Sequence, residues 1–156
     1  MVGIGYDVHR LAAGETLVLG GVTLESRLGT VAHSDGDVLI HAIMDALLGV
    51  LALGDIGLHF PDNAAEWRGA DSISLLKRVH QLIRNEGAHI VNIDSTVVLE
   101  SPRLRPHIDA MRARIAEALG LDIKRVSVKA TTNERLGFIG REEGVVAYAV
   151  AQVEYD

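Results

Sequence analysis

Residues 36–53 read GDVLIHAIMDALLGVLAL, and this stretch decides the fold. Its length and composition predict a helix, and because apolar residues lie almost all round it, we expect the helix to be deeply buried. Strand-like segments lie on both sides of it in the chain, the first at 2–9 and the last at 144–153. Helix and strand signals that alternate in this way predict a sheet covered by a layer of helices.

The other elements follow from turn and cap signals. Asp71 predicts the start of a second helix that Gly87 stops, and Gly20-Gly21 predicts a small hairpin over 17–24. Further elements are expected as a turn at 55–57, a loop at 58–70, strands at 90–99 and 126–130, and a helix at 104–119. The fold class is therefore α/β, an α+β layer with a mixed β-sheet and helices on one face, in a single domain over residues 1–156.

The last strand has apolar side chains on both faces. One face is formed by Val145, Ala147, Ala149, Ala151 and Val153, and the other by Val146, Tyr148 and Val150. Strands that are apolar on both faces are usually covered on both, but a small domain with one helical layer covers only one of them. We therefore expect an oligomer in which the sheets of neighbouring subunits pack together.

Composition narrows the classes of partner. The 156 residues carry a formal charge of −6, which argues against a nucleic-acid partner. The longest apolar run, 38–53, contains His41 and Asp45 and is too short to cross a membrane, so no membrane partner is expected. Met1 runs straight into a strand-like segment without a basic start, so we expect no signal peptide. The absence of cysteine is compatible with the cytoplasmic location that we expect.

A metal site is predicted from the spacing of three polar residues. Asp7 and His9 share one face of the first strand, and His41 lies on the buried helix. Nitrogen and oxygen ligands on two rigid elements suit a zinc ion with one coordination position open. Asp37 and Asp45 lie on the same helix stripe as His41 and either orient that histidine or serve as a helix cap and a backbone acceptor, respectively.

Two junctions could bind phosphate. Backbone amides and hydroxyls at 129–138 could hold phosphate oxygens, with Glu134 on Mg²⁺ or Mn²⁺, but the pattern by itself favours an ordinary capped turn. The segment 99–105 carries two arginines between a strand and a helix, and it could equally be a plain helix start.

Several motifs in order give a resemblance over essentially the whole chain. They are Asp-Val-His at 7–9, His-Ser-Asp-Gly-Asp at 33–37 followed by His41, Asp-Ile-Gly at 55–57 with Phe-Pro-Asp at 60–62, and Lys-Ala-Thr-Thr-x-Glu-x-Leu-Gly-Phe-x-Gly-Arg at 129–141. With this set the chain resembles the 2-C-methyl-D-erythritol 2,4-cyclodiphosphate synthase family of the non-mevalonate isoprenoid pathway. These lyases convert 4-diphosphocytidyl-2-C-methyl-D-erythritol 2-phosphate into the cyclic diphosphate and CMP.

The resemblance implies a homotrimer, with sheets packed around a trimer axis and active sites between subunits, that uses zinc together with magnesium or manganese. It implies that Asp7, His9 and His41 bind zinc, that Glu134 binds the second cation with the diphosphate, and that His33 and Thr132 are catalytic. The substrate-binding residues it implies are Asp7, His9, His33, Ser34, Asp55, Ile56, Gly57, Phe60, Pro61, Asp62, Asn63, Ala64, Leu99, Glu100, Ser101, Pro102, Arg103, Leu104, Arg105, Thr131, Thr132, Asn133, Glu134, Phe138 and Arg141. It also places Arg141 towards the trimer axis, where three arginines would gather, so we expect an anion there.

The chemistry agrees with this implication. The nucleophile is a phosphate of the substrate itself, which is already anionic, so catalysis needs charge neutralisation and positioning more than a strong base. The loop at 61–70 has few apolar anchors, and we expect it to be mobile until substrate binds. Asn63-Ala64-Ala65, Arg103 and Asn133 depart from residues common in the family, but none of them belongs to the expected zinc set. The alternatives are another metal-dependent phosphohydrolase and a non-catalytic trimeric small-molecule binder.

Overall fold

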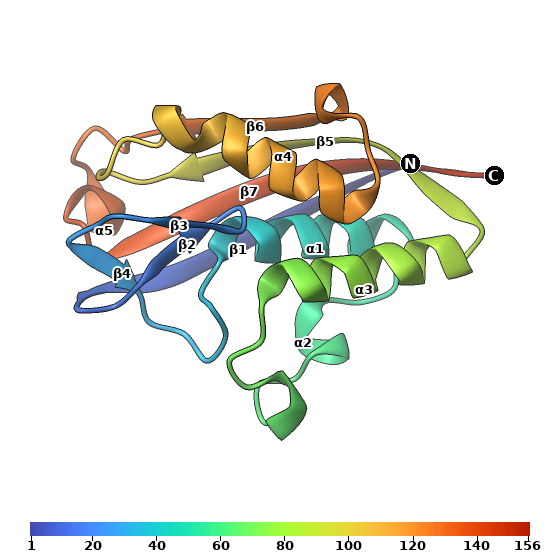
Figure 1. The fold of residues 1–156 in the computed structure, drawn as a ribbon, viewed down its shortest axis with the longest axis horizontal. Coiled ribbons are helices and arrows are strands. Elements are labelled where there is room, and N and C mark those ends of the chain that lie inside the picture. Colours follow the sequence, from blue (N-terminus) through green and yellow to red (C-terminus); the bar gives the residue numbers. More distant parts are fainter.

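Strand β1 (Val2–Ala13) and helix α1 (Val38–Val50) form the centre of the molecule in a computed structural model that describes all residues, 1–156 (Figure 1). The other strands are β2 (Leu17–Leu19), β3 (Val22–Leu24), β4 (Leu28–Thr30), β5 (Ala88–Val98), β6 (Val126–Thr131) and β7 (Gly144–Tyr155). The other α-helices are α2 (Ile56–His59), α3 (Ser72–Asn85), α4 (Ile108–Leu119) and α5 (Gly137–Gly140), and short 3₁₀ helices span Ala65–Trp67, Arg105–His107 and Ile123–Arg125.

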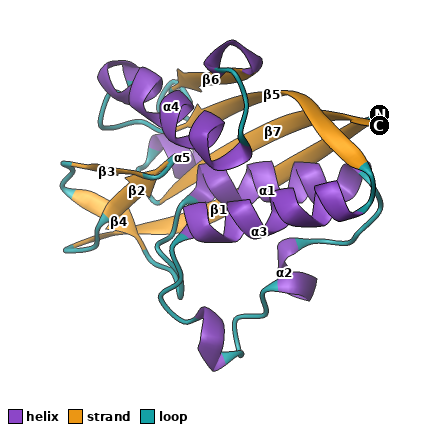
Figure 2. Ribbon diagram, turned by 45° about the vertical axis from the view of Figure 1, so that its right-hand side comes forward, coloured by secondary structure: helices purple, strands orange, loops and turns teal.

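The main sheet is mixed, as the sequence predicts. Its strand order is β4-β1-β7-β5-β6, in which β5 and β6 are parallel and the other neighbours are antiparallel. Helices α1, α3 and α4 lie together on one side of this sheet (Figures 1 and 2). The expectation of an α/β fold with helices on one face is therefore confirmed. None of the helices has the length and apolar character that crossing a membrane requires.

Helix α1 packs directly on the backbone of β1. A Cβ atom added at Gly3 would lie 2.2 Å from the carbonyl oxygen of Ala46, and one added at Gly5 would lie 1.8 Å from that of Ala42. No side chain fits into so short a separation, so these two glycines allow the close approach of helix and strand. The helix is also enclosed, as its apolar character predicts, with ten of its residues buried.

Several element boundaries match their signals, and others differ. Asp71 caps α3 and the Gly20-Gly21 hairpin forms between β2 and β3. The expected turn at 55–57 is wrong, because Asp55 accepts the N–H of Leu58 and caps the short helix α2. Helix α4 begins at Ile108, four residues later than expected, since a 3₁₀ helix comes first. The sequence analysis missed β4 and α5, which have only three and four residues.

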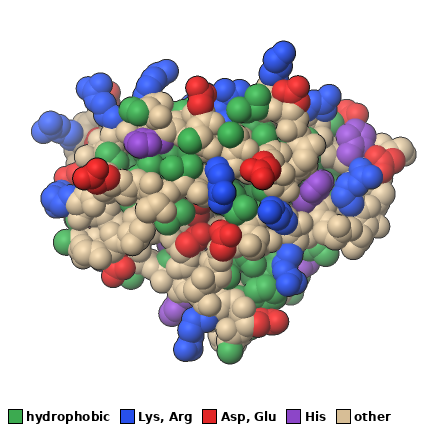
Figure 3. All heavy atoms as spheres, viewed as in Figure 1, with side chains coloured by type: hydrophobic (Ala, Val, Ile, Leu, Met, Phe, Trp, Pro, Cys, Tyr) green, Lys and Arg blue, Asp and Glu red, His purple; other side chains and the backbone are tan.

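The two faces of the sheet differ in their surroundings. The side with the helices carries charged side chains of both signs on its surface, lysine and arginine as well as aspartate and glutamate (Figure 3). On the opposite side of the sheet, only the short helix α5 covers part of β7, where Ile139 packs against Val146 and Val98. The rest of that side of β1 and β7 exposes a continuous apolar patch, in which neighbouring strands pair Ile4 with Val150 and Tyr6 with Tyr148. Ile4 is 73% exposed and Tyr148 is 47% exposed. We call the residues Val2, Ile4, Tyr6, Val8, Tyr148 and Val150 the sheet patch.

Candidate metal centre and pocket

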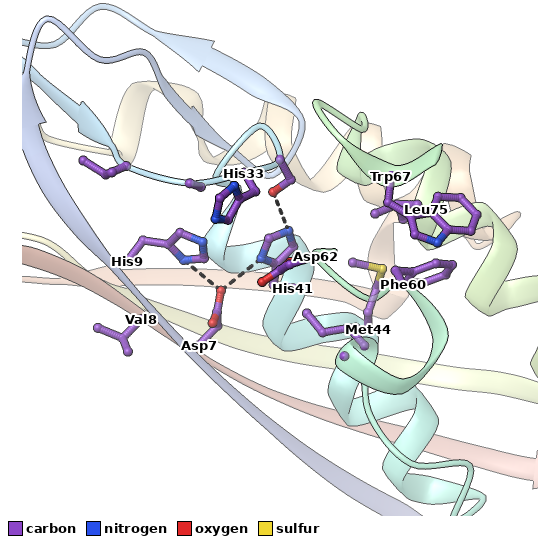
Figure 4. A pocket seen from close by; sticks show the side chains of 15 residues that line it. Asp7, Val8, His9, His33, His41, Met44, Phe60, Asp62, Trp67 and Leu75 are labelled. Atoms are coloured by element: carbon purple, nitrogen blue, oxygen red, sulfur yellow. Dashed lines mark hydrogen bonds and ion pairs between the residues drawn. The ribbon is translucent and has the colours of Figure 1, made fainter. Parts of the chain in front are cut away.

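Three side chains from the two central elements converge at one point. Alternation along β1 turns Asp7 and His9 to the face that α1 covers, and the helix supplies His41. Asp7 Oδ2 lies 3.0 Å from His9 Nδ1 and 3.1 Å from His41 Nδ1. One ligand atom from each residue lies within 4.8 Å of the others, and the close-up in Figure 4 shows the three side chains pointing at one another.

The arrangement fits a metal ion. His9 Nδ1 is buried and has no hydrogen-bond partner, because Asp7 Oδ2 is close to it but lies outside hydrogen-bond geometry. An unpartnered buried nitrogen is costly, and a cation between the three ligand atoms would satisfy it. Burial opposes the charge of Asp7, but the two neighbouring imidazoles of His41 and His9 hold its pKa below the ordinary value. A carboxylate and two imidazoles could hold a metal ion, and they are ligand types that zinc commonly takes with a fourth position open.

Neither Asp37 nor Asp45 orients His41, so that interpretation is wrong and the alternative is confirmed. Asp37 is fully buried, caps α1 through the N–H of Ile40 at 3.1 Å, and accepts the N–H groups of Gly20 at 2.9 Å and Gly21 at 2.7 Å. Burial raises the pKa of Asp37 to about 6, although these N–H groups favour the charged form. Asp45 accepts the N–H of Ile56 at 2.8 Å.

The residues that do contact His41 on its other side come from a different element. His41 Nε2 lies 3.0 Å from Ser72 Oγ, and Ser72 in turn donates its hydroxyl to Asp35. Ser72 is the first residue of α3, thirty-one positions from His41 in the chain. The sequence offers one signal for it, a serine directly after the helix-capping Asp71, but nothing in that signal points to the histidine.

A pocket of about 370 Å³ opens beside the metal ligands. Of the residues that the family resemblance implies, the structure places His33, Ser34, Ile56, Gly57, Phe60 and Asp62 in its lining. The sequence analysis did not include the apolar lining formed by Val8, Val31, Ala32, Met44, Trp67 and Leu75. In Figure 4, His33 lies close to the three ligands, whereas Phe60, Trp67 and Leu75 lie at the far end of the pocket.

A second group of expected site residues lines a separate hollow. It has a volume of about 380 Å³, and its lining combines the expected residues Glu100, Ser101, Thr132 and Glu134 with three that were not expected, Arg135, Gly140 and Glu142. The backbone of Glu134 and Arg135 is left-handed, with φ values of 53° and 62°, and the N–H of Arg135 donates to Glu100 at 2.7 Å. None of these residues lines the first pocket, so the two groups of expected site residues do not meet within one chain. Glu134 belongs to no cluster of three metal-ligand side chains.

The remaining expected residues line neither of these hollows. Asn133 holds the carbonyl of Leu136 through its amide at 2.8 Å, while Leu99 and Leu104 are buried in the core. The other members of the set are Asp55, Pro61, Asn63, Ala64, Pro102, Arg103, Arg105, Thr131, Phe138 and Arg141. Arg141 pairs with Glu143 at 3.1 Å, so its charge is compensated within the chain. The expected anion depends on three copies of Arg141 meeting at a trimer axis, so it stays a prediction.

The loop over residues 61–70 has an apolar anchor that the sequence analysis overlooked. The ring of Trp67 packs edge-on against Phe60 with centroids 5.0 Å apart, and the guanidinium of Arg78 lies 5.0 Å from the Trp67 ring. The N–H of Gly69 donates to the carbonyl of His33 at 3.0 Å. Trp67 is thus one apolar anchor of this loop and lines the pocket, and the expected mobility of the loop before substrate binds stays a prediction.

Comparison with known proteins identifies the family. The model of the YgbB family matches residues 1–154. A 2-C-methyl-D-erythritol 2,4-cyclodiphosphate synthase from Synechococcus elongatus is 58% identical over 155 residues, which cover 99% of this chain and 97% of the relative. The bifunctional IspDF structure from Campylobacter jejuni is 43% identical with a TM-score of 0.95, where the match covers 99% of this chain and 42% of the longer one. The Plasmodium falciparum IspF complex with CDP is 32% identical with a TM-score of 0.87 and coverage of 99% and 96%. On this match along almost its whole length, the chain belongs to the YgbB family, with 2-C-methyl-D-erythritol 2,4-cyclodiphosphate synthases among its relatives.

Proposed function

We propose that the chain cyclises 4-diphosphocytidyl-2-C-methyl-D-erythritol 2-phosphate to 2-C-methyl-D-erythritol 2,4-cyclodiphosphate and CMP, as a lyase of the non-mevalonate pathway. The observation that carries the proposal is the cluster of Asp7, His9 and His41 in the lining of a pocket, in a chain 58% identical to a 2-C-methyl-D-erythritol 2,4-cyclodiphosphate synthase. Residues 1–156 would act as one cytoplasmic synthase domain.

Asp7, His9 and His41 would hold zinc, and Glu134 would hold magnesium or manganese together with substrate phosphates. Bound cations would neutralise phosphate charge and polarise the phosphorus that is attacked. A single carboxylate is enough for the second ion, because magnesium takes most of its other ligands from phosphates and water. Bound cations would reduce the main obstacle to the reaction, which is the repulsion between the 2-phosphate and the diphosphate of the substrate.

The remaining roles are those that the family resemblance implies. His33 and Ser34 lie beside the metal ligands and would contact the 2-phosphate, while Ile56, Gly57 and Phe60 would hold the methylerythritol part. His33 and Thr132 would stabilise charge in the transition state by donating hydrogen bonds. Residues 99–105 would hold cytidine and residues 131–134 the diphosphate, which agrees with the CDP bound in the Plasmodium falciparum relative.

A homotrimer with active sites between subunits would bring the first pocket and the second hollow together. The first pocket and the second hollow share no lining residue, and one substrate must reach both if the roles above are right. The sheet patch supplies an apolar surface for the contact, since large exposed apolar patches on one face typically mark an interface. Sheets packed through this patch around a three-fold axis would bring the pocket of one subunit to the hollow of its neighbour.

Phosphorus NMR tests the reaction. The protein is incubated with the cytidyl substrate, Zn²⁺ and Mg²⁺, and CMP and a cyclic diphosphate are expected in equal amounts. His41→Ala is expected to abolish both signals while leaving the far-UV circular dichroism spectrum unchanged, since the core does not depend on a metal. Release of inorganic phosphate without cyclic product would indicate a phosphohydrolase. Substrate that binds to the protein but is not converted would indicate a non-catalytic binder. Either result contradicts the proposed function.

A further inference from the structure

Both ring nitrogens of His41 have polar neighbours. Nδ1 faces Asp7 Oδ2 at 3.1 Å, and Nε2 faces Ser72 Oγ at 3.0 Å. His41 is 7% exposed and Ser72 is fully buried, so water does not provide other partners. The orientation of the ring is therefore fixed by these two contacts.

The protons of this chain of contacts can be counted. The hydroxyl of Ser72 has one hydrogen, and it is donated to Asp35 Oδ1, while the backbone N–H of Ser72 donates to Asp35 Oδ2 at 2.9 Å. A carboxylate only accepts, so Asp35 fixes the direction of both bonds. Ser72 Oγ must then accept its hydrogen from His41, which places a proton on Nε2.

Other polar groups near the ring cannot replace this pair. Ser34 Oγ lies 3.4 Å from His41 Nε2, a longer contact, and it also accepts the N–H of Gly36. Asp37 and Asp45 are engaged with backbone N–H groups on either side of the helix. Asp35 and Ser72 are thus the only carboxylate and hydroxyl that form a connected chain of hydrogen bonds to this nitrogen.

We infer that Asp35 and Ser72 are positioning residues that hold His41 in the Nε2–H tautomer and so keep the lone pair of Nδ1 directed at Asp7 and His9. The inference rests on the proposed function, because it assigns His41 Nδ1 as the metal-binding atom. Histidines that bind metals commonly donate their other N–H to a carboxylate or carbonyl, which raises their basicity and fixes the ring. Here Ser72 accepts the hydrogen bond from His41 and donates its own hydrogen to the carboxylate of Asp35. The same contact connects the first residue of α3 to α1.

Zinc affinity tests the assignment without any substrate. The dissociation constant for Zn²⁺ is measured by competition with a chromogenic chelator for the wild type, Ser72→Ala, Asp35→Asn and the control Ser74→Ala. Ser74 is two residues along the same helix, and its exposed hydroxyl donates to Asp71, away from His41. Loss of such an outer partner typically weakens metal binding by about 10- to 100-fold, so we expect that loss for the first two variants and no change for Ser74→Ala. Circular dichroism in EDTA confirms that each protein is folded.

A spectroscopic measurement separates positioning from a purely structural role. In long-range ¹H–¹⁵N spectra of the zinc-loaded wild type, we expect His41 Nε2 to appear as a protonated nitrogen whose hydrogen exchanges slowly, and Ser72→Ala to make that exchange fast. A protonated Nδ1 in the zinc-loaded wild type, or equal zinc affinity in Ser72→Ala and Ser74→Ala, would overturn the inference while leaving the metal site intact. If His41→Ala binds zinc as tightly as the wild type, the proposed metal site itself fails, and this inference falls with it.

Discussion

Mixed trimers would provide a direct test of the proposed shared active site. The perturbation is a pair of variants, His41→Ala, which damages the first pocket, and Thr132→Ala, which damages the second hollow. Removing a ligand of the zinc set should leave no measurable turnover, and removing one donor to a transition-state charge typically lowers the rate by about 10²-fold or more. Each variant trimer should therefore be nearly inactive, although each keeps one half of the site undamaged.

The expected activity of the mixture follows from how the halves combine. If a site takes His41 from one subunit and Thr132 from the next, it is intact only when the first subunit is the Thr132→Ala chain and the second is the His41→Ala chain. In a random equal mixture each condition holds for half of the subunits, so about a quarter of the sites in the symmetric ring are intact. If both residues belonged to one site within one chain, no site in any mixture would be intact.

The assay measures CMP release after the two variants are unfolded, mixed and refolded together. Differently tagged chains and native mass spectrometry verify that hybrid trimers have formed. The matched control mixes His41→Ala with the His41→Ala/Thr132→Ala double variant, where no subunit has His41, and should remain inactive. Confirmed hybrids with no more activity than their parents would refute the shared site.

Three further predictions concern stability, assembly and the loop. Asp37→Ala leaves three backbone N–H groups, two of them buried, without an acceptor. It should lower the free energy of unfolding measured in urea by about 3–5 kcal/mol, against about 1 kcal/mol for the exposed cap variant Asp55→Ala. Because the pKa of Asp37 is raised to about 6, the stability that this carboxyl contributes is lost as the pH rises through that value, so the cost should be larger at pH 5 than at pH 7.5. Ile4→Lys, in the sheet patch, should yield monomers in analytical ultracentrifugation, whereas Ile123→Lys should not; a trimer of unchanged stability in the first variant would contradict the proposed interface. Trp67 is the single tryptophan and lines the pocket, so its fluorescence should change when the cytidyl substrate binds, and an unchanged spectrum at saturating substrate would count against a loop that closes over it.

Much of the architecture could be predicted because its signals are local. Asp71 marks the start of its helix by capping it, and Gly87 marks the end through its left-handed backbone conformation. Residues 36–53 are apolar on nearly all sides of the helix, which implies burial whatever elements pack against it. Alternation along β1 was enough to bring Asp7 and His9 to one face. The convergence with His41 needed one further assumption, that helix and strand are in contact.

Features that depend on pairing across the chain could not be predicted in the same way. Helical spacing suggested that Asp37 lies beside His41, but Asp37 is the cap residue, outside the regular helix, and its side chain turns back to the N–H groups of the first turn and the hairpin. Ser72 reaches His41 only because α3 packs on α1, which no local pattern encodes. The compensation of Arg141 by Glu143 is a choice of side-chain rotamers that spacing leaves open.

Strand β1 also limits how freely this protein can change over evolutionary time. Its residues alternate between the two faces of the sheet. Gly3, Gly5, Asp7 and His9 face helix α1, whereas the even-numbered positions from Val2 to Val8 form most of the sheet patch. Exchanging a glycine would push the helix away and separate His41 from Asp7, while exchanging an outward residue would alter the surface offered to a second copy. A descendant of this sequence can therefore vary its loops and its charged helix surface gradually, but drift in these few positions would alter the packing of helix on strand at once, and with it the proposed metal site and the proposed assembly.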